Sequence, residues 1–235
     1  PVLRQAAVLA LSKLMCVSAQ FCEAHLPLLF NILKTSQDPV IRSNIVIALG
    51  DIAVSFGSII DEVSASQGSA FIFDLSLPKQ NSDRLYEGLS DRDMMVKKNT
   101  LMVLTHLILN GMIKVKGQLG EMAKCLEDKD TRVSDLAKLF FTELSTKDNA
   151  LYNNLQDVIS HLSVGTHAVE EDVFETTMKF IFTFIEKDRQ AEAIVEKLCQ
   201  RFRLADTERQ WRDIAYCLSL LPFKSERSMK KLIEG

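Results

Sequence analysis

Hydrophobic and polar positions along this chain form one recurring sequence motif. In it, an apolar position and a basic or polar residue precede a stretch with apolar residues three and four apart. Residues 4, 42, 97 and 134 mark four copies, spaced by 38, 55 and 37 residues. The copies are Val2-Leu3-Arg4 before AAVLAL, Val40-Ile41-Arg42 before NIVIAL, Met95-Val96-Lys97 before NTLMVL, and Arg132-Val133-Ser134 before LAKLFF. A period near 38 residues indicates HEAT repeats, whose units are helix pairs.

The first helix of each unit is predicted from its apolar stripe and its start signal. The stripes have a period of 3.6 residues, as in Ile41, Ile45, Leu49, Ile52 and Phe56, and again in Val133, Leu136, Ala137, Phe140 and Leu144. An Asp or Pro precedes three of the copies, at 38–39, 91–93 and 128–130. Such residues cap a helix and place negative charge at the positive end of its dipole.

Second helices are predicted after each first helix. The amphipathic segments are Leu26 to Leu33, Ile113 to Leu126 and Ala150 to Leu162, and the alternation continues at Val173 to Ile185, Ala191 to Phe202, Arg209 to Leu221 and Ser225 to Ile233. A single pair cannot bury its apolar face, so neighbouring pairs must stack. The sequence thus predicts an all-α fold, an α-α superhelix of about six HEAT/armadillo-like pairs forming one solenoid fragment over residues 1–235, with a concave surface for partners.

The spacing of 55 residues exceeds the period and predicts an insertion at about residues 64–83. Its apolar residues alternate imperfectly, as in a short strand or a docking segment: Phe71, Ile72, Phe73, Leu75 and Leu77. We favour a surface loop whose apolar residues pack on the solenoid, since insertions in repeats usually map to loops. The alternative is a linear motif that docks on a partner.

Composition narrows the class of protein. The chain is 47% hydrophobic and 25% charged, with a formal net charge of −3. Its longest apolar runs fall short of the roughly 20 residues that cross a bilayer, so we expect no membrane span. Five cysteines without a CxxC pair indicate buried thiols in a reducing compartment. Because the chain begins at Pro1, we expect a fragment of a longer protein.

Motifs with a catalytic mechanism are absent from the sequence: it has no GxGxxG, GxxxxGK[ST], HExxH or GxSxG. Cys16, Cys22 and His25 lack a fourth zinc ligand, so we interpret the cysteines as buried thiols. We interpret His106 as a hydrogen-bonded core or interface residue, and the acidic run at 170–172 as a helix start. We therefore expect no enzyme, cofactor, metal or small-molecule substrate. Trp211 is either core or a partner anchor, and we favour core.

Basic residues form two clusters in this mildly acidic chain. The first contains Lys97, Lys98, Lys114, Lys116 and Lys124, opposed only by Glu121, for a local net charge of +4. The second spans residues 197–231, carries a local net charge of +5, and includes Arg201, Arg203, Arg209 and Arg212. Such clusters bind nucleic-acid phosphates or an acidic partner, or they form a solvated face balanced by carboxylates.

Four long blocks of the sequence carry a family resemblance. They are DPVIRSNIVIALGDIA at 38–53, NTLMVLTHLILNGMIKVKGQLGEMA at 99–123, LAKLFFTELSTKDNALYN at 136–153 and EKLCQRFRLADTERQWRDIAYCLSLLP at 196–222. These blocks resemble the C-terminal HEAT region of the condensin complex subunit 1 family. The stretch from about Ser64 to Ser82 departs from that pattern, because the join from IIDE to LYEGLSD is usually shorter in the family.

The resemblance implies a function as well as a fold. It implies a non-catalytic regulatory subunit that binds the kleisin subunit of condensin, contacts an SMC ATPase head and helps to hold DNA in mitotic chromosome condensation, in the nucleus and on chromosomes. ATP hydrolysis would then belong to the SMC partners. Two alternatives stay open: a HEAT scaffold of another class, such as a transport receptor or phosphatase scaffold, and an enzyme whose site uses His, Cys and carboxylates.

Overall fold

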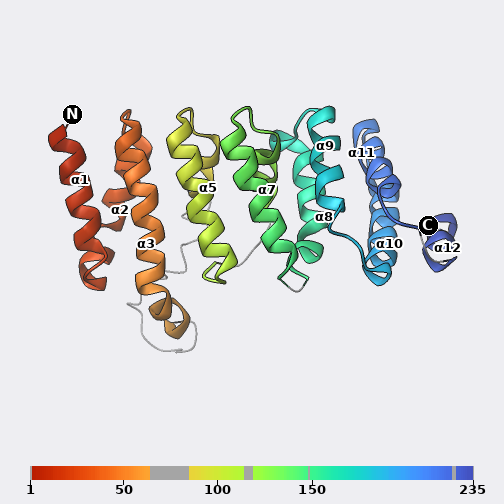
Figure 1. Cartoon of the computed structure of the whole chain (residues 1–235), viewed down its shortest axis with the longest axis horizontal. Coiled ribbons are helices and arrows are strands. Elements are labelled where there is room, and N and C mark those ends of the chain that lie inside the picture. Colours follow the sequence, from red (N-terminus) through yellow and green to blue (C-terminus); the bar gives the residue numbers. More distant parts are fainter. Residues whose placement is uncertain (1, 64–84, 114–118, 148, 224–225, 235) are drawn as a thin grey trace. The chain divides into compact units, whose positions relative to one another are not determined.

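A computed structural model describes residues 2–63, 85–113, 119–147, 149–223 and 226–234. These residues form α-helices, short 3-10 helices and their connections, and none of them lies in a strand. Within each part of the chain, helices pack against others that lie one or two elements away in the sequence (Figure 1). The predicted fold class, all-α with HEAT/armadillo-like repeats, is therefore confirmed. The insertion predicted at about 64–83, with all five of its apolar candidates, lies outside the described residues.

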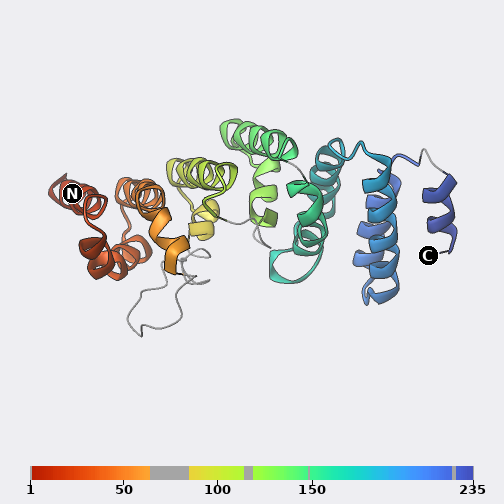
Figure 2. The same ribbon diagram turned by 90° about the horizontal axis from the view of Figure 1, so that it is seen from below.

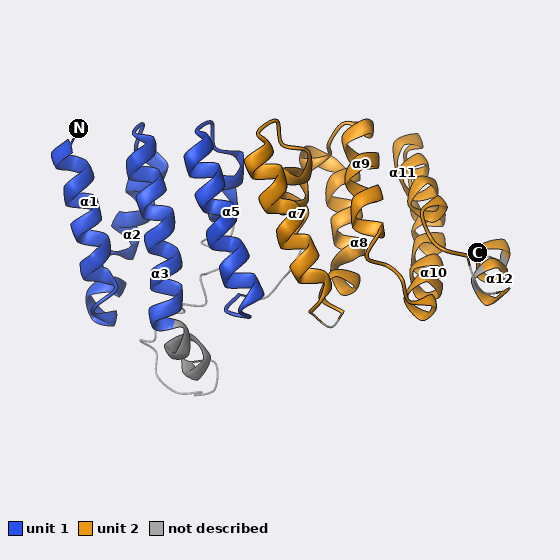
Figure 3. Cartoon of the chain, viewed as in Figure 1, with its two compact units in different colours: residues 1–114 blue, residues 115–235 orange. Residues whose placement is uncertain are grey.

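The chain divides into two compact units (Figure 3), which we describe separately. Unit 1 covers residues 1–114 and unit 2 covers residues 115–235. Each unit has its own buried apolar core. The continuity of a single solenoid across both units stays a prediction.

Unit 1 contains three long first helices side by side: α1 (Val2–Met15), α3 (Pro39–Val63) and α5 (Met94–Leu109). The helix α2 (Ala19–Thr35) packs against α1 and α3, and the 3-10 helix η1 (Gly88–Ser90) packs against α5. In Figure 2, α1, α3 and α5 form one layer of this unit, and α2 lies below that layer. The helix pairs of unit 1 thus stack through their first helices.

The central helix of unit 1 is α3, and its stripe is buried as predicted at four of five positions. Ile41, Ile45, Leu49 and Ile52 are buried, while Phe56 is half-buried. The first 18 residues of α3, Pro39–Phe56, are long and apolar enough by length and composition to cross a membrane, with a mean hydropathy of 1.4. Half of that window is buried inside the protein, where α3 contacts α1, α2 and α5. We therefore interpret α3 as a core helix.

Unit 2 begins with short helices and continues with longer ones. In chain order its elements are α6 (Leu119–Lys124), η2 (Cys125–Glu127), α7 (Thr131–Ser145), α8 (Ala150–Ser163), η3 (Gly165–His167), α9 (Glu171–Phe182), α10 (Asp188–Leu204), α11 (Glu208–Ser219) and α12 (Glu226–Glu234). The helix α8 is central, because it contacts α6, α7, α9 and α11. Phe140, Phe141 and Phe174 are fully buried in the core of this unit.

Two second helices differ from their predicted bounds. The helix α2 begins at Ala19, earlier than the predicted Leu26, because Ser18 caps it by accepting a hydrogen bond from the Phe21 amide. The helix α6 begins at Leu119, later than the predicted Ile113. Just after the end of α5, Gly111 adopts a φ of +70°, a left-handed conformation that turns the chain away from the helix. The apolar pattern alone did not indicate where α2 and α6 begin.

Candidate functional site

A recurring turn precedes the first helices α3, α5 and α7. In each copy a side-chain oxygen accepts the backbone N–H two residues ahead: Ser36 from Asp38, Asp91 from Asp93, and Asp128 from Asp130. The aspartate that donates this N–H then accepts, through its own side chain, a backbone N–H from the first turn of the following helix. The aspartates at 38, 93 and 130 thus satisfy amides that the helix leaves unpaired. The predicted helix start signals are confirmed.

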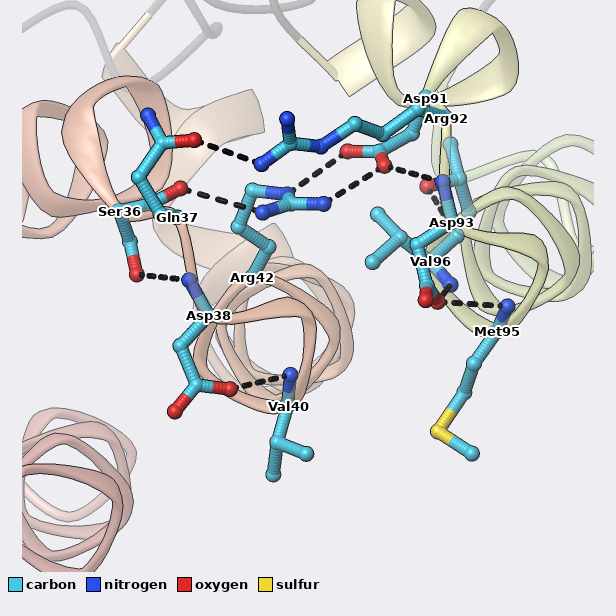
Figure 4. Close-up of polar contacts among 11 residues, drawn as sticks. Ser36, Gln37, Asp38, Val40, Arg42, Asp91, Arg92, Asp93, Met95 and Val96 are labelled. Atoms are coloured by element: carbon cyan, nitrogen blue, oxygen red, sulfur yellow. Dashed lines mark hydrogen bonds and ion pairs between the residues drawn. The ribbon is translucent and has the colours of Figure 1, made fainter. Parts of the chain in front are cut away.

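In unit 1, a buried arginine of α3 joins the turn before α5 to the preceding repeat (Figure 4). The Arg42 Nε and Nη2 atoms donate to the two carboxylate oxygens of Asp91, each at 2.8 Å, and Nη1 donates to the Ser36 carbonyl at 3.1 Å. The two side chains are only 8% and 14% exposed. A planar guanidinium is suited to this bidentate geometry. The pair therefore fixes α3 against the turn before α5.

The charges of this pair stabilise one another. Burial raises the pKa of the Asp91 carboxyl, but hydrogen bonds from Arg42 and the Asp93 amide, with the positive charges of Arg42 and Arg92, outweigh burial and lower it. The hydrogen bond to Asp91 raises the pKa of Arg42. Both groups are therefore ionised near neutral pH. A similar polar contact joins α1 to the turn before α3, where Gln5 of α1 donates to Asp38 at 2.8 Å.

An open groove of about 470 Å³ lies beside the Arg42–Asp91 pair. Its apolar lining comes from α2, α3 and α5 through Phe30, Leu33, Val46 and Val96. Its polar rim includes Lys34 and Arg92, and the Arg92 guanidinium donates to Gln37 at 2.6 Å. The groove combines apolar area with a few hydrogen-bonding groups, as ligand-binding pockets do.

The first predicted basic cluster is only partly described. Lys97 and Lys98 lie half-buried on α5 in unit 1. Lys114 and Lys116 lie outside the described residues. Lys124 is in unit 2, where its ammonium donates to Glu121 at 2.8 Å. Lys124 is thus held in an ion pair within its own unit.

The second predicted cluster divides into two groups. Arg201 and Arg203 lie in the last turn of α10, where Arg203 is exposed and Arg201 is half-buried. Arg209 and Arg212 lie on α11 and are engaged in ion pairs. Arg212 pairs with Glu171 and with Glu208, both at 3.0 Å. The basic charge of α11 is therefore offset locally, as the solvated-face alternative describes.

Arg209 organises a buried polar site between α8, α9 and α11. Its Nε donates to the Asp213 carboxylate at 2.8 Å, and its Nη2 donates to the Val169 carbonyl at 3.0 Å. Asp213 is only 1% exposed and also accepts from the Ser163 hydroxyl at 2.6 Å. These contacts satisfy a buried carboxylate that would otherwise be costly. The geometry thus gives Arg209 a structural role in unit 2.

Exposed apolar side chains border the turn between α10 and α11. Phe202, Leu204 and Trp211 are 42%, 79% and 44% exposed. Our preference for Trp211 as a core residue was wrong, because the buried stripe of α11 passes through Ile214 and Cys217 instead. Exposed Trp and Phe beside Arg201 and Arg203 are residue types that anchor protein interfaces.

The histidines and cysteines singled out in the sequence differ in their surroundings. Cys22 is buried, and burial raises its pKa to about 11, as expected of an unreactive thiol. His25 stacks on Phe21 and donates to the Phe21 carbonyl at 2.8 Å. His106 is exposed, not in the core, and is hydrogen-bonded to Asn110, the residue that follows α5. Glu171 and Asp172 open α9, as the helix-start interpretation predicted.

A cluster that sequence reasoning missed lies in unit 2. Glu121 of α6, His161 of α8 and His167 of η3 bring ligand atoms within 4.8 Å of one another. In the sequence, Glu121 stands out only as a charge that opposes lysines. No spacing rule finds the cluster, because Glu121 precedes the histidines by 40 and 46 residues and only the packing of α6 on α8 brings them together.

Comparisons with known proteins agree across the whole chain. The family model described as non-SMC mitotic condensation complex subunit 1 matches residues 76–219. Condensin complex subunit 1 of Saccharomyces cerevisiae is 45% identical over 235 residues, which is 100% of this chain and 18% of that protein. The proteins of the same name from Xenopus laevis and Homo sapiens are 48% and 45% identical, over 99% and 100% of this chain and 16% and 15% of theirs. The chain thus spans less than a fifth of the length of these relatives.

Proposed function

The chain belongs to the condensin complex subunit 1 family, and on that premise we propose that it is a non-catalytic scaffold segment of condensin. In this proposal it binds the kleisin subunit, contacts an SMC ATPase head and holds DNA through its phosphates, in mitotic chromosome condensation in the nucleus and on chromosomes. The observation that carries the proposal is the identity of about 45% over the full chain. That identity favours this family over a transport receptor or a phosphatase scaffold.

The repeat fold supports a binding role. Stacked helix pairs present long surfaces formed by successive repeats, and such surfaces bind extended partners. The groove beside Arg42 and the exposed residues Phe202, Leu204 and Trp211 offer apolar area for protein partners in unit 1 and unit 2 respectively. An extended kleisin segment and the folded surface of an SMC head are partners of the two kinds that these surfaces fit.

The DNA part of the proposal rests on cations near helix ends. Arg201 and Arg203 lie in the last turn of α10, and Lys97 and Lys98 lie near the start of α5. Long cationic side chains on a repeat surface reach phosphates without reading base sequence. Lys124, Arg209 and Arg212 have carboxylate partners in their own unit.

A charge-reversal pair with a matched control tests the DNA proposal. In Arg201→Glu/Arg203→Glu, we expect weaker binding to duplex DNA and a shallower dependence of log affinity on log salt, by about one unit for each phosphate that the variant no longer neutralises. Lys187→Glu/Arg189→Glu changes the charge by the same amount at the other end of α10, where both side chains are exposed. We expect the control to bind DNA nearly as the parent does. Unchanged affinity and salt slope in Arg201→Glu/Arg203→Glu would overturn the assignment.

A further inference from the structure

Three side chains of unit 2 converge on one carboxylate oxygen. The His161 Nε2–H donates to Glu121 Oε1 at 2.6 Å, and the His167 Nδ1–H donates to the same oxygen at 2.8 Å. The two imidazole rings stack with their centroids 4.6 Å apart. Among the described residues, this is the one group of three or more His, Cys, Asp or Glu residues whose geometry allows a shared metal ion.

The position of His161 depends on a glycine. A Cβ atom at Gly120 would lie 2.4 Å from Cδ2 of the His161 ring and 2.7 Å from its Cβ, closer than real contacts allow. The absence of a side chain at residue 120 therefore lets the ring lie directly against α6, with its Nε2 beside Glu121 of the same helix. His167 approaches from η3, two residues after the left-handed Gly165.

We propose that Glu121, His161 and His167 form a binding site for a divalent transition metal ion of the zinc class. The donors are two imidazole nitrogens and one carboxylate oxygen, which is a common three-ligand set for Zn²⁺. A tetrahedral ion with bonds of about 2.0 to 2.1 Å holds its ligand atoms about 3.3 Å apart. The present distances from Glu121 to His161 and His167, 2.6 and 2.8 Å, therefore need to widen by about 0.7 and 0.5 Å, which small rotations of the Glu121 and His167 side chains supply.

Glu121 already has a cationic partner in this structure, the ammonium of Lys124. Burial raises the pKa of Glu121, but hydrogen bonds from His161 and Lys124 and the charge of Lys124 lower it to about 2. The ammonium of Lys124, 2.8 Å from the same oxygen, occupies part of the space that the ion needs and must turn away. Its side chain is 27% exposed, so solvent is accessible to it.

Binding the ion rearranges protons within the rings. In the absence of metal, the nitrogens that face Glu121 carry hydrogen, since a carboxylate only accepts. With metal, each facing nitrogen donates its lone pair to the ion, and each neutral ring carries its proton on the other nitrogen. A fourth position stays open toward solvent, because His167 is 58% exposed. Water fills that position in the isolated chain.

Zinc binding to the 235-residue chain, purified without a histidine tag, is the direct test. We expect one Zn²⁺ per chain by titration calorimetry with micromolar or tighter affinity, a rise in melting temperature with Zn²⁺, and no rise with Mg²⁺. Bound Co²⁺ is expected to show the visible absorption of a low-symmetry site. His167→Gln and His161→Gln should each weaken Zn²⁺ binding by at least about 100-fold, beyond the roughly 10–100-fold typical of outer-shell changes.

Matched variants separate this site from other ligands. His25→Gln and Cys16→Ser change a histidine and a partly accessible thiol of unit 1 and should leave Zn²⁺ affinity unchanged. Lys124→Met should tighten binding, because it removes a competing cation. The proposal is overturned if the parent does not bind Zn²⁺, if His167→Gln binds as the parent does while folded by circular dichroism, or if Lys124→Met leaves the affinity unchanged or weaker.

Discussion

Removing the guanidinium of Arg42 shows how strongly successive repeats are joined in unit 1. In Arg42→Met the side chain keeps its apolar length but loses three hydrogen bonds, two to Asp91 and one to the Ser36 carbonyl. Asp91 keeps the hydrogen bond from the Asp93 amide. The substitution therefore leaves a largely buried carboxylate without its counterion and should destabilise the fold.

The size of the effect follows from the burial of the pair. Breaking a fully buried ion pair costs about 3 to 5 kcal/mol, whereas an exposed pair contributes about 0 to 1 kcal/mol. Arg42 and Asp91 are 8% and 14% exposed, but they also line an open groove from which water can reach them. We therefore expect Arg42→Met to lower the free energy of unfolding by about 2 to 3 kcal/mol, between these limits.

Urea denaturation followed by circular dichroism measures this loss, and the fluorescence of Trp211, the chain's one tryptophan, identifies the transition of unit 2. Asp91→Asn completes a double-mutant cycle, in which we expect the double variant to be less destabilised than the sum of the single variants by at least about 1 kcal/mol. Arg132→Met is the matched control, because Arg132 pairs with Asp130 at 2.9 Å but is 66% exposed, and its midpoint should not change. Equal midpoints for Arg42→Met and the parent, or strict additivity in the cycle, would show that the pair does not join the repeats.

Three further predictions concern acid, close packing and a partner surface. Because the folded pKa of Asp91 is lowered, the stability from the Arg42–Asp91 pair is fully present above the unfolded pKa of about 3.9 and is lost as pH falls through the lower folded value. The difference in urea midpoint between the parent and Arg42→Met should therefore shrink as the pH falls, because protonation first relieves the uncompensated Asp91 carboxylate of the variant and then breaks the ion pair of the parent, and a difference that grows in acid would contradict this assignment. Gly88→Ala places a Cβ 2.4 Å from Oγ1 of the buried Thr100 and should destabilise the chain by about 1 to 3 kcal/mol in thermal or urea unfolding. The loss should exceed that of the control Gly111→Ala, whose Cβ meets no atom within 4 Å and adds only backbone strain. Trp211→Ala should weaken binding to condensin partners in a pull-down while changing the urea midpoint little, since the side chain is 44% exposed. A large loss of stability with full binding would show instead that Trp211 is a packing residue.

The repeating sequence motif predicted the helices whose starts depend on nearby residues in the sequence. The stripes of α3 and α7 are buried along most of their length, and Asp93 and Asp130 cap α5 and α7 from positions marked by the sequence. The helix α8 begins at the predicted residue, Ala150. These features depend on residues within one or two turns of each other, so periodicity and capping rules are sufficient to find them.

Features that depend on packing between helices were not predictable in the same way. In the sequence, Arg209 was a candidate for binding phosphates or an acidic partner, but folding brings Val169, 40 residues earlier, to its guanidinium. Glu121 and His161, also 40 residues apart, meet because α6 packs on α8. Trp211 is exposed because the buried stripe of α11 runs along another face. Single-sequence patterns carry no information about which helix faces adjoin.

Cross-linking mass spectrometry on an assembled condensin that contains this chain within its full-length subunit is the decisive test of the proposed scaffold role. We expect cross-links from lysines of this segment, such as Lys34 at the groove of unit 1, to the kleisin subunit, and from Lys197 of α10 or its neighbours to an SMC ATPase head. If lysines throughout residues 1–235 cross-link efficiently within their own subunit but never to kleisin or to an SMC head, this segment is not the scaffold that we propose.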